Sequence, residues 1–118
     1  SIVGDGGALM TGSELATAVA QRAKIRVIVA NNNHYGTIRY HQEVHFPTRD
    51  HYATNLVNPD FAKYGESFGL KCFTIHNTEE ILPTIKSAMD VDGPSLIEFK
   101  MSLELNTSTA TISQLQTK

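Results

Sequence analysis

The feature that most constrains the fold of this chain is a nearly continuous β-branched run at residues 26–30, Arg26-Val27-Ile28-Val29-Ala30. A run that lacks alternating polar residues is typical of a strand buried on both faces of a parallel sheet. Further strand-like runs at 71–75 and 95–101 alternate with helical patterns. The sequence therefore predicts an α/β fold, with a parallel sheet, helices on both faces and right-handed crossovers.

Size and composition are those of one globular domain. The chain has 118 residues, of which 41% are hydrophobic and 19% charged, values that exclude a disordered tail, a collagen-like repeat and a coiled coil. The net charge of -2 gives no basic excess, so we expect no nucleic-acid partner. The longest aliphatic stretch, residues 25–30, is too short to cross a bilayer, and we expect no membrane partner. Without a visible signal peptide, the cytoplasm is the default location.

Local patterns predict the order of the elements. We expect a strand end at residues 1–3, a turn at 4–7, helices at about 11–22, 35–42 and 78–89, a loop at 44–57, strands at 71–75 and 95–101, and a tail from 102. Thr11 and Glu14 have the spacing of a capping box. Asn58 is the predicted cap of a further helix, with Pro59 in its first turn and Gly69 closing it.

Two polar clusters end the first two predicted strands, and we expect them to meet. Asp5 follows the first strand and Asn32 the second, and 24 residues separate Gly6 from Asn31. These residues can form a loop, a helix of about 12 residues and a strand of about 6 residues. The helix takes the chain back by about 18 Å, and the strand returns it by about 20 Å. Both clusters therefore lie at the carboxyl edge of the sheet, where ligands of open α/β sheets bind.

The chemistry of these clusters suits a diphosphate with Mg²⁺. One carboxylate and neutral oxygens are ligands that Mg²⁺ accepts, and the N–H groups of Gly6, Gly7 and the following helix can hold phosphate. Two better-known motifs do not match, since no Gly-Lys-Ser/Thr follows the glycines and Leu9 stands where a dinucleotide fingerprint has its third glycine. Each cluster taken alone could also be a plain turn or strand end.

Gly4-Asp5-Gly6, followed after 24 residues by Asn31-Asn32, resembles the thiamine diphosphate-binding motif of thiamine-dependent enzymes. Residues 4–18, 31–39, 58–62 and 93–98 resemble the acetolactate synthase-like branch, which includes pyruvate oxidases and 2-oxoacid decarboxylases. The resemblance covers nearly the whole chain. It implies that residues 1–118 are the C-terminal part of a diphosphate-binding domain, truncated at its N-terminus, with 102–118 as a tail.

The resemblance also implies a set of site residues and two cofactors, thiamine diphosphate and Mg²⁺. Asp5, the Asn32 side chain and the backbone carbonyl of His34 would bind Mg²⁺. Residues expected around the cofactor are Gly4, Gly6, Gly7, Met10, Tyr35 and Gly36, with Met10 near the rings. Asn33 stands where the family often has Gly, a mild departure because Asn tolerates the left-handed conformation.

No catalytic residue is implied within this chain. In the family, the Glu that activates the cofactor lies in a separate pyrimidine-binding domain, which normally comes from the partner subunit. We therefore expect the parent protein to be a lyase or transferase that cleaves or ligates a 2-oxoacid, and the 118-residue chain alone to be inactive. The expected partners are that substrate, the pyrimidine-binding domain and a second copy in a dimer.

Other interpretations remain open. The chain could be a non-catalytic diphosphate-binding or interaction module, or a nucleotide-binding α/β protein that responds to NAD or ATP. His41 and His45, with His51 nearby, could form a two-His zinc site, although substrate contact by residues 39–42 is the preferred interpretation. Cys72, the only cysteine, excludes an intrachain disulfide and is expected in the core.

Overall fold

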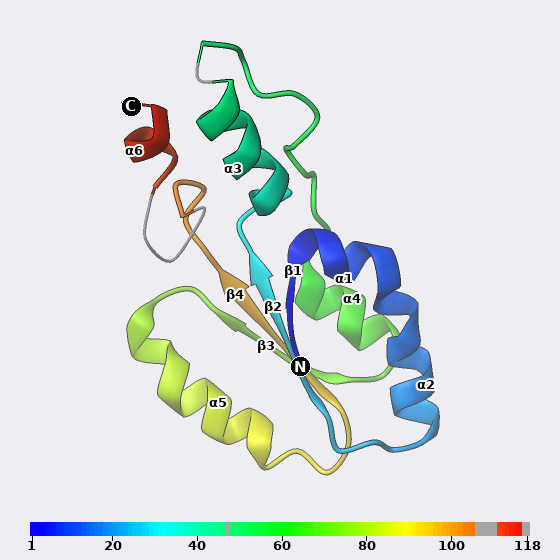
Figure 1. Cartoon of the computed structure of the whole chain (residues 1–118). Helices are drawn as coiled ribbons and strands as arrows, with labels where there is room; N and C mark the ends of the chain where they lie inside the picture. Colours follow the sequence, from blue (N-terminus) through cyan, green and yellow to red (C-terminus); the bar gives the residue numbers. More distant parts are fainter. Residues whose placement is uncertain (47, 106–110, 117–118) are drawn as a thin grey trace.

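A computed structural model describes residues 1–46, 48–105 and 111–116. Its centre, in these residues, is a sheet of four parallel strands: β1 (Ile2–Gly4), β2 (Arg26–Asn31), β3 (Lys71–Ile75) and β4 (Ser95–Lys100). The strand order is β1-β2-β4-β3, so the last strand of the sequence lies inside the sheet (Figure 1). In its register, Leu96 of β4 is opposite Val27 of β2 and Cys72 of β3. The predicted α/β fold with a parallel sheet is confirmed.

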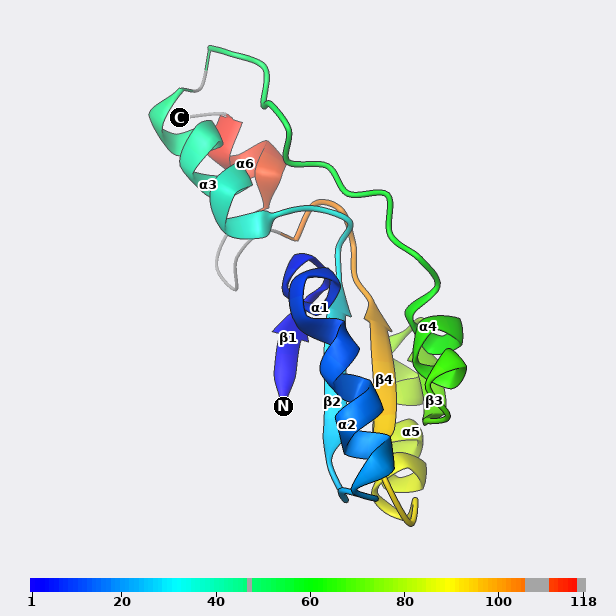
Figure 2. The same cartoon turned by 90° about the vertical axis from the view of Figure 1, so that its right-hand side faces the viewer.

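Helices cover both faces of the sheet, as predicted. One face carries α1 (Asp5–Thr11), the 3₁₀ helix η1 (Gly12–Glu14), α2 (Leu15–Ala20) and α4 (Phe61–Ser67), and the other carries η2 (Thr78–Glu80) and α5 (Ile81–Met89) (Figures 1 and 2). Beyond the carboxyl ends of β2 and β4, α3 (Gly36–His45) packs against α6 (Ile112–Gln116). In the part of the chain that the structure describes, no helix has the length and apolarity needed to span a membrane.

Successive side chains of β2 and β4 point to opposite faces of the sheet and join different core clusters. Val29 and Leu96, each 1% exposed, belong to a core cluster that Phe61 of α4 completes. Their neighbours Ile28 and Ile97 point the other way and pack with Ala88 of α5. Because strand side chains alternate with a period of two, a strand covered on both sides needs apolar residues at successive positions. This explains the β-branched run in the sequence.

The segment after β1 differs from its prediction. The helix α1 begins at Asp5, directly after the strand, where a turn was expected. Thr11 ends this helix and its hydroxyl donates to the carbonyl of Gly7 at 3.2 Å, while Glu14 accepts from Thr17 at 3.3 Å. The predicted capping box of Thr11 and Glu14 is therefore wrong. A threonine inside a helix bonds the carbonyl one turn back instead of capping the next helix.

The start of α4 also corrects a prediction. Its N-cap is Asp60, whose Oδ1 accepts a hydrogen bond of 3.0 Å from the Lys63 N–H, so the prediction that Asn58 caps this helix is wrong. The Lys63 N–H bond lowers the pKa of the Asp60 carboxyl below its ordinary value. The predicted helix end is confirmed, because Gly69 follows α4 with a φ of +95°.

Other boundaries agree closely. The strand predicted at 71–75 matches β3, whereas α3 runs on to His45. Pro83 lies in the first turn of α5, where its missing N–H leaves no helical hydrogen bond unmade. Of the predicted tail, residues 106–110 and 117–118 lie outside the described residues, and α6 lies within it.

Arg26 at the start of β2 fixes the turn that leads into β4. Its Nη1 donates to the Gly93 carbonyl at 2.6 Å, and its Nη2 donates to the carbonyls of Met89 and Val91 at 2.9 and 2.7 Å. These carbonyls end α5 and follow it, where a cation complements the helix dipole. The guanidinium therefore joins β2 to the α5–β4 turn.

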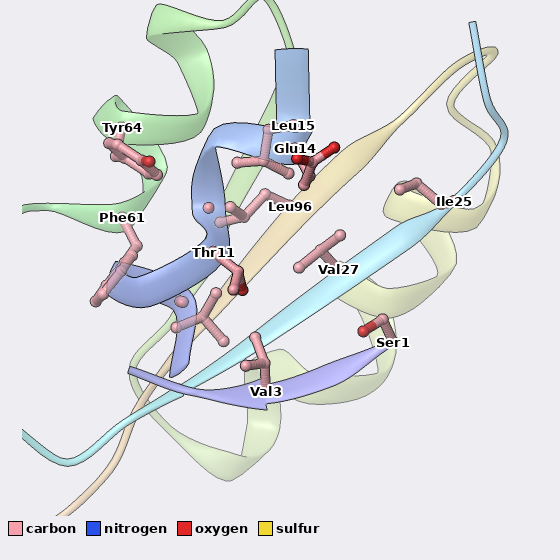
Figure 3. A pocket seen from close by; sticks show the side chains of 13 residues that line it. Ser1, Val3, Thr11, Glu14, Leu15, Ile25, Val27, Phe61, Tyr64 and Leu96 are labelled. Carbon is pink, nitrogen blue, oxygen red and sulfur yellow. The ribbon is translucent and has the colours of Figure 1, made fainter. Parts of the chain in front are cut away.

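An apolar hollow of about 220 Å³ lies between the sheet and the α1–η1–α2 segment. Figure 3 shows Val3 of β1 and Val27 of β2 on one side of it, with Leu15 and Leu96 across from them. The hollow reaches Ser1, beside the outer edge of the sheet. Ile2 on this edge strand is 77% exposed.

Candidate functional site

The polar cluster after β1 and residues 34–38, which follow the second polar cluster at 31–33, line one hollow at the carboxyl edge of the sheet. Its volume is about 280 Å³, and its lining residues are Gly4, Asp5, Gly6, Gly7, His34, Tyr35, Gly36, Thr37 and Ile38. The convergence follows from the pairing of β1 with β2, in which Gly4 lies opposite Ala30 and both strands end at the same level. The predicted convergence of the two strand ends at one edge of the sheet is confirmed, although Asn32 itself does not line the hollow.

The carboxylate of Asp5 is held in a fixed orientation beside this hollow. The residue is 2% exposed, and Oδ1 accepts from the Gly6 N–H at 3.0 Å. Its Oδ2 accepts from Nδ2 of Asn58 at 2.7 Å. An ionised carboxylate can accept about four hydrogen bonds, so both oxygens keep lone pairs for a cation.

Asn32 and His34 are both held by the segment that follows β4. The Asn32 Nδ2 donates to the Leu105 carbonyl at 3.0 Å, and its Oδ1 accepts from the His34 N–H at 3.4 Å. The His34 ring is buried with Nε2 3.0 Å from the Leu103 carbonyl oxygen. His34 lines the hollow with Asp5, whereas Asn32 is not among the residues that line it.

Met10 is the other predicted residue that the structure does not bring into the hollow. It lies near the end of α1, and its side chain is 70% exposed. The remaining predicted residues, Gly4, Gly6, Gly7, Tyr35 and Gly36, all line the hollow.

Behind the hollow, a buried polar network involves residues to which the sequence had assigned no role. Asn31, 2% exposed, donates from Nδ2 to Oε1 of Glu98 at 2.6 Å. Glu98 is fully buried in β4, and Lys100 Nζ lies 2.7 Å from the same oxygen. Asn33 adopts a left-handed conformation with φ of +59°, in line with the tolerance expected of Asn. Two charged residues, Glu98 and Lys100, inside the predicted strand at 95–101 are the feature of the sequence that could have indicated this network.

A second, larger hollow of about 500 Å³ shares His34 as a lining residue. Its lining residues include Arg39, His51, Asn55 and Glu104. Arg39 forms a buried ion pair with Glu43 one turn further along α3, so its charge is already compensated.

The two-His zinc hypothesis gains no support. The rings of His41 and His45 stack on α3 with centroids 5.7 Å apart and planes 7° apart. Within the described ranges, no group of three or more His, Cys, Asp or Glu side chains could hold a metal ion. His51 lies in the larger hollow.

Cys72 packs against the core cluster of the α1–α4 face, as predicted. Burial raises the pKa of its thiol to about 11. The thiol is therefore protonated at neutral pH and has a structural rather than a reactive environment.

With this geometry in place, comparison with known proteins identifies the class. The chain belongs to the family described as "Thiamine pyrophosphate enzyme, C-terminal TPP binding domain", whose model matches residues 1–99. The resemblance inferred from the Gly4-Asp5-Gly6 and Asn31-Asn32 clusters is thereby confirmed.

Individual relatives have several activities. The chain is 36% identical over 109 residues to 3D-(3,5/4)-trihydroxycyclohexane-1,2-dione hydrolase of Bacillus subtilis (strain 168), a match that covers 86% of this chain and 17% of that protein. It is 35% identical over 97 residues to the catabolic acetolactate synthase of Raoultella terrigena, covering 82% and 17%. The thiamine diphosphate-dependent 4-hydroxybenzoylformate decarboxylase of Rhodococcus jostii RHA1 superimposes with a TM-score of 0.79 at 26% identity, over 86% of this chain and 19% of that one. The chain thus spans less than a fifth of the length of these relatives.

Proposed function

We propose that this chain holds the diphosphate end of thiamine diphosphate, together with Mg²⁺, in the hollow between residues 4–7 and 34–38. The observation that carries the proposal is that both segments, separated by residues 8–33 of the sequence, line a single hollow with the buried Asp5. The glycines after β1 allow phosphate to approach the backbone closely. The start of α3, at Gly36, adds the positive end of a helix dipole.

The donor set fits Mg²⁺, which prefers hard oxygen ligands. The proposed ligands are the carboxylate of Asp5, the Oδ1 of Asn32 and the backbone carbonyl of His34. The Leu105 carbonyl holds the Asn32 nitrogen at 3.0 Å, and this leaves Oδ1 as the ligand atom of that amide. The present partner of Oδ1 is the His34 N–H at 3.4 Å, a long hydrogen bond that a cation can replace at small cost. We place the exposed Met10 near the cofactor rings.

Bound thiamine diphosphate supplies the electron sink that cleavage or carboligation of a 2-oxoacid requires. We propose that the whole protein is a lyase or transferase of this kind. Its activating Glu belongs to a pyrimidine-binding domain, so this chain contributes binding residues and no catalytic residue. The relatives include a synthase and a decarboxylase, which support this reaction class. They also include a hydrolase, whose reaction belongs to a different class.

Calorimetric titration of the 118-residue chain tests the binding. Thiamine diphosphate should release heat with Mg²⁺ present and none with EDTA, and thiamine without phosphate should not bind. Asp5→Asn, which keeps the shape and removes the charge, should abolish the Mg²⁺-dependent heat. Binding of ATP or NAD in place of thiamine diphosphate would favour a nucleotide-binding protein instead.

Pyruvate turnover separates an enzyme part from a binding module. The chain alone should match the buffer blank, and turnover should appear only when the pyrimidine-binding domain is supplied. Binding without turnover in that mixture would favour the non-catalytic alternative.

We also propose that the chain forms a homodimer. The free outer edge of β1 and the apolar hollow beside it support this, because exposed edges and apolar patches promote association. Covering a few hundred Å² of apolar surface at about 25 cal/mol per Å² is worth several kcal/mol. Light scattering at micromolar concentration should give about twice the monomer mass of 13.0 kDa, and a clean monomer would contradict the proposal.

A further inference from the structure

The side chain of Asn58 reaches into the candidate site from a distant part of the chain. Its Nδ2 lies 2.7 Å from Oδ2 of Asp5, 2.8 Å from Oδ1 of Asn31 and 3.2 Å from Oδ1 of Asn33. The two N–H groups of this amide thus face oxygens from three positions of the site, and one N–H is shared between two acceptors. The Oδ1 of Asn58 is buried and has no hydrogen-bond partner within the described part of the chain, so the nitrogen alone holds this side chain.

The loop before α4 delivers Asn58 to this position. It runs beside the cluster that follows β2, where the Tyr35 N–H donates to the Thr54 carbonyl at 2.9 Å and the Leu56 N–H to the Asn33 carbonyl at 2.8 Å. Three residues after Asn58, the fully buried Phe61 anchors the start of α4 in the core. Asn58 is therefore fixed from both sides along the chain.

A buried carboxylate, Glu98, determines which atom of the Asn31 amide faces Asn58. Glu98, fully buried and paired with Lys100, accepts from Nδ2 of Asn31 at 2.6 Å. Because a carboxylate accepts hydrogen bonds, the nitrogen of Asn31 must face Glu98 and its oxygen must face Asn58. The result is a chain of hydrogen bonds, Asp5–Asn58–Asn31–Glu98, that links the segment after β1 to β2 and β4.

We infer that Asn58 is a positioning residue for Asp5, whose carboxylate it orients toward the hollow by donating to Oδ2. The inference rests on the proposed function for the role of Asp5 as a ligand. A neutral amide suits this task, since it orients the carboxylate and leaves its charge to the cation. A lysine at the same place would neutralise that charge, and an alanine would leave Oδ2 without its partner. Residues that hold a metal ligand in place affect metal affinity without touching the metal.

The first experiment needs no ligand. Carbon-13 NMR of the carboxyl groups would follow the Asp5 resonance in Asn58→Leu, which keeps the branched shape and removes the donor. The resonance should shift in this variant and stay in place in Val57→Ala, a control that removes a fully exposed side chain from the same loop. If Asn58→Leu does not unfold cooperatively, Asn58→Ser replaces it. An unshifted Asp5 resonance in a folded Asn58 variant would overturn the inference.

The second experiment measures affinity, with Mn²⁺ as a paramagnetic stand-in for Mg²⁺ and thiamine diphosphate present. Asn58→Leu should weaken Mn²⁺ binding by roughly 10- to 100-fold, and Val57→Ala should match the wild type. Equal affinity in Asn58→Leu and wild type would overturn the inference while the proposed function stands. Absence of binding in the wild type would contradict the proposed function, and the Asp5 resonance would then decide the role of Asn58.

Discussion

The ring of Tyr35 lies directly against the Cα of Gly6. A Cβ built on Gly6 would stand 2.5 Å from Cε1 and 2.6 Å from Cδ1 of that ring. Real Cβ contacts are not this short, so the segment after β1 and the segment after β2 touch only because residue 6 has no side chain.

Gly6→Ala should therefore push the Tyr35 ring away from the segment after β1. We expect a loss of about 1–3 kcal/mol in the free energy of unfolding, the usual range for an overpacked site. Gly4→Ala is the comparison, because a Cβ on Gly4 meets nothing within 4 Å and its φ of -71° suits alanine. Urea unfolding of both variants is the measurement. A loss equal in the two variants would show that the Tyr35 contact is not the cause.

Gly65 of α4 faces the strands in a similar way. A Cβ at this position would stand 2.6 Å from Sγ of Cys72 and 3.3 Å from Cδ1 of Leu96. Gly65→Ala should destabilise the chain by about 1–3 kcal/mol, although the better helix propensity of alanine offsets up to about 1 kcal/mol. Adding Cys72→Ala removes the sulfur and should recover most of the loss in thermal unfolding. A double variant as unstable as Gly65→Ala would mean that the clash lies elsewhere.

Arg26 should contribute more to stability than the exposed charges near it. Arg26→Ala leaves the Met89, Val91 and Gly93 carbonyls without their charged donor and should cost about 1.5–3 kcal/mol. Lys24→Ala is the matched control, because the pair of Lys24 with Asp92 has side chains that are 72% and 70% exposed. That loss should stay within about 1 kcal/mol. Similar losses in the two variants would contradict the role given to Arg26.

The cap at Asp60 predicts a stability that depends on acid pH. The Lys63 N–H holds the folded-state pKa of this carboxyl below its ordinary value of about 3.9, so its stabilisation is present above that pH. The stabilisation is lost as the pH falls through the lowered folded-state value. Asp60→Ala should cost about 1 kcal/mol at pH 7, and its difference from the wild type should shrink below pH 4.

Asp60→Asn serves as the control, because it keeps a capping oxygen that does not titrate. Measured by thermal unfolding from pH 7 to pH 2, its difference from Asp60→Ala should stay constant. A wild-type advantage over Asp60→Ala that persists unchanged at pH 2 would contradict the assigned cap.

The strands and their parallel arrangement could be predicted from composition. A strand that is buried on both faces of a parallel sheet needs apolar residues at successive positions. The β2 range came from a nearly continuous β-branched run and the β3 range from a short, mostly apolar one, and neither pattern needs tertiary information. Helix starts were harder. Asn58 and Asp60 both belong to residue types that are preferred as N-caps, so local sequence does not distinguish them. In the structure, Asp60 caps α4, and Asn58 forms a hydrogen bond to Asp5 instead.

The candidate site likewise has a part that could be predicted from the sequence and a part that could not. The convergence of the ends of β1 and β2 could be predicted, because helix and strand lengths in the crossover nearly cancel and bring both strand ends to one edge. The contact between Asn58 and Asp5 joins residues 53 apart along the chain through an irregular loop that has no periodicity to interpret. The buried Glu98 and its bond to Asn31 likewise depend on which strand became the neighbour of β2.

The position of β4 has a consequence for biosynthesis. In the described sheet, β2 and β3 pair only through β4, which is also the last strand to be translated. A nascent chain that ends at residue 94 therefore has β1 and β2 on one side and β3 on the other, with no ladder between them. Asp5 and the glycines of the candidate site leave the ribosome long before Glu98. The Asn31 amide is therefore made before the carboxylate to which it donates. The residues of the candidate site that follow β1 are thus translated before the strand that supports them. A chain released before residue 98 lacks the carboxylate that holds the Asn31 amide.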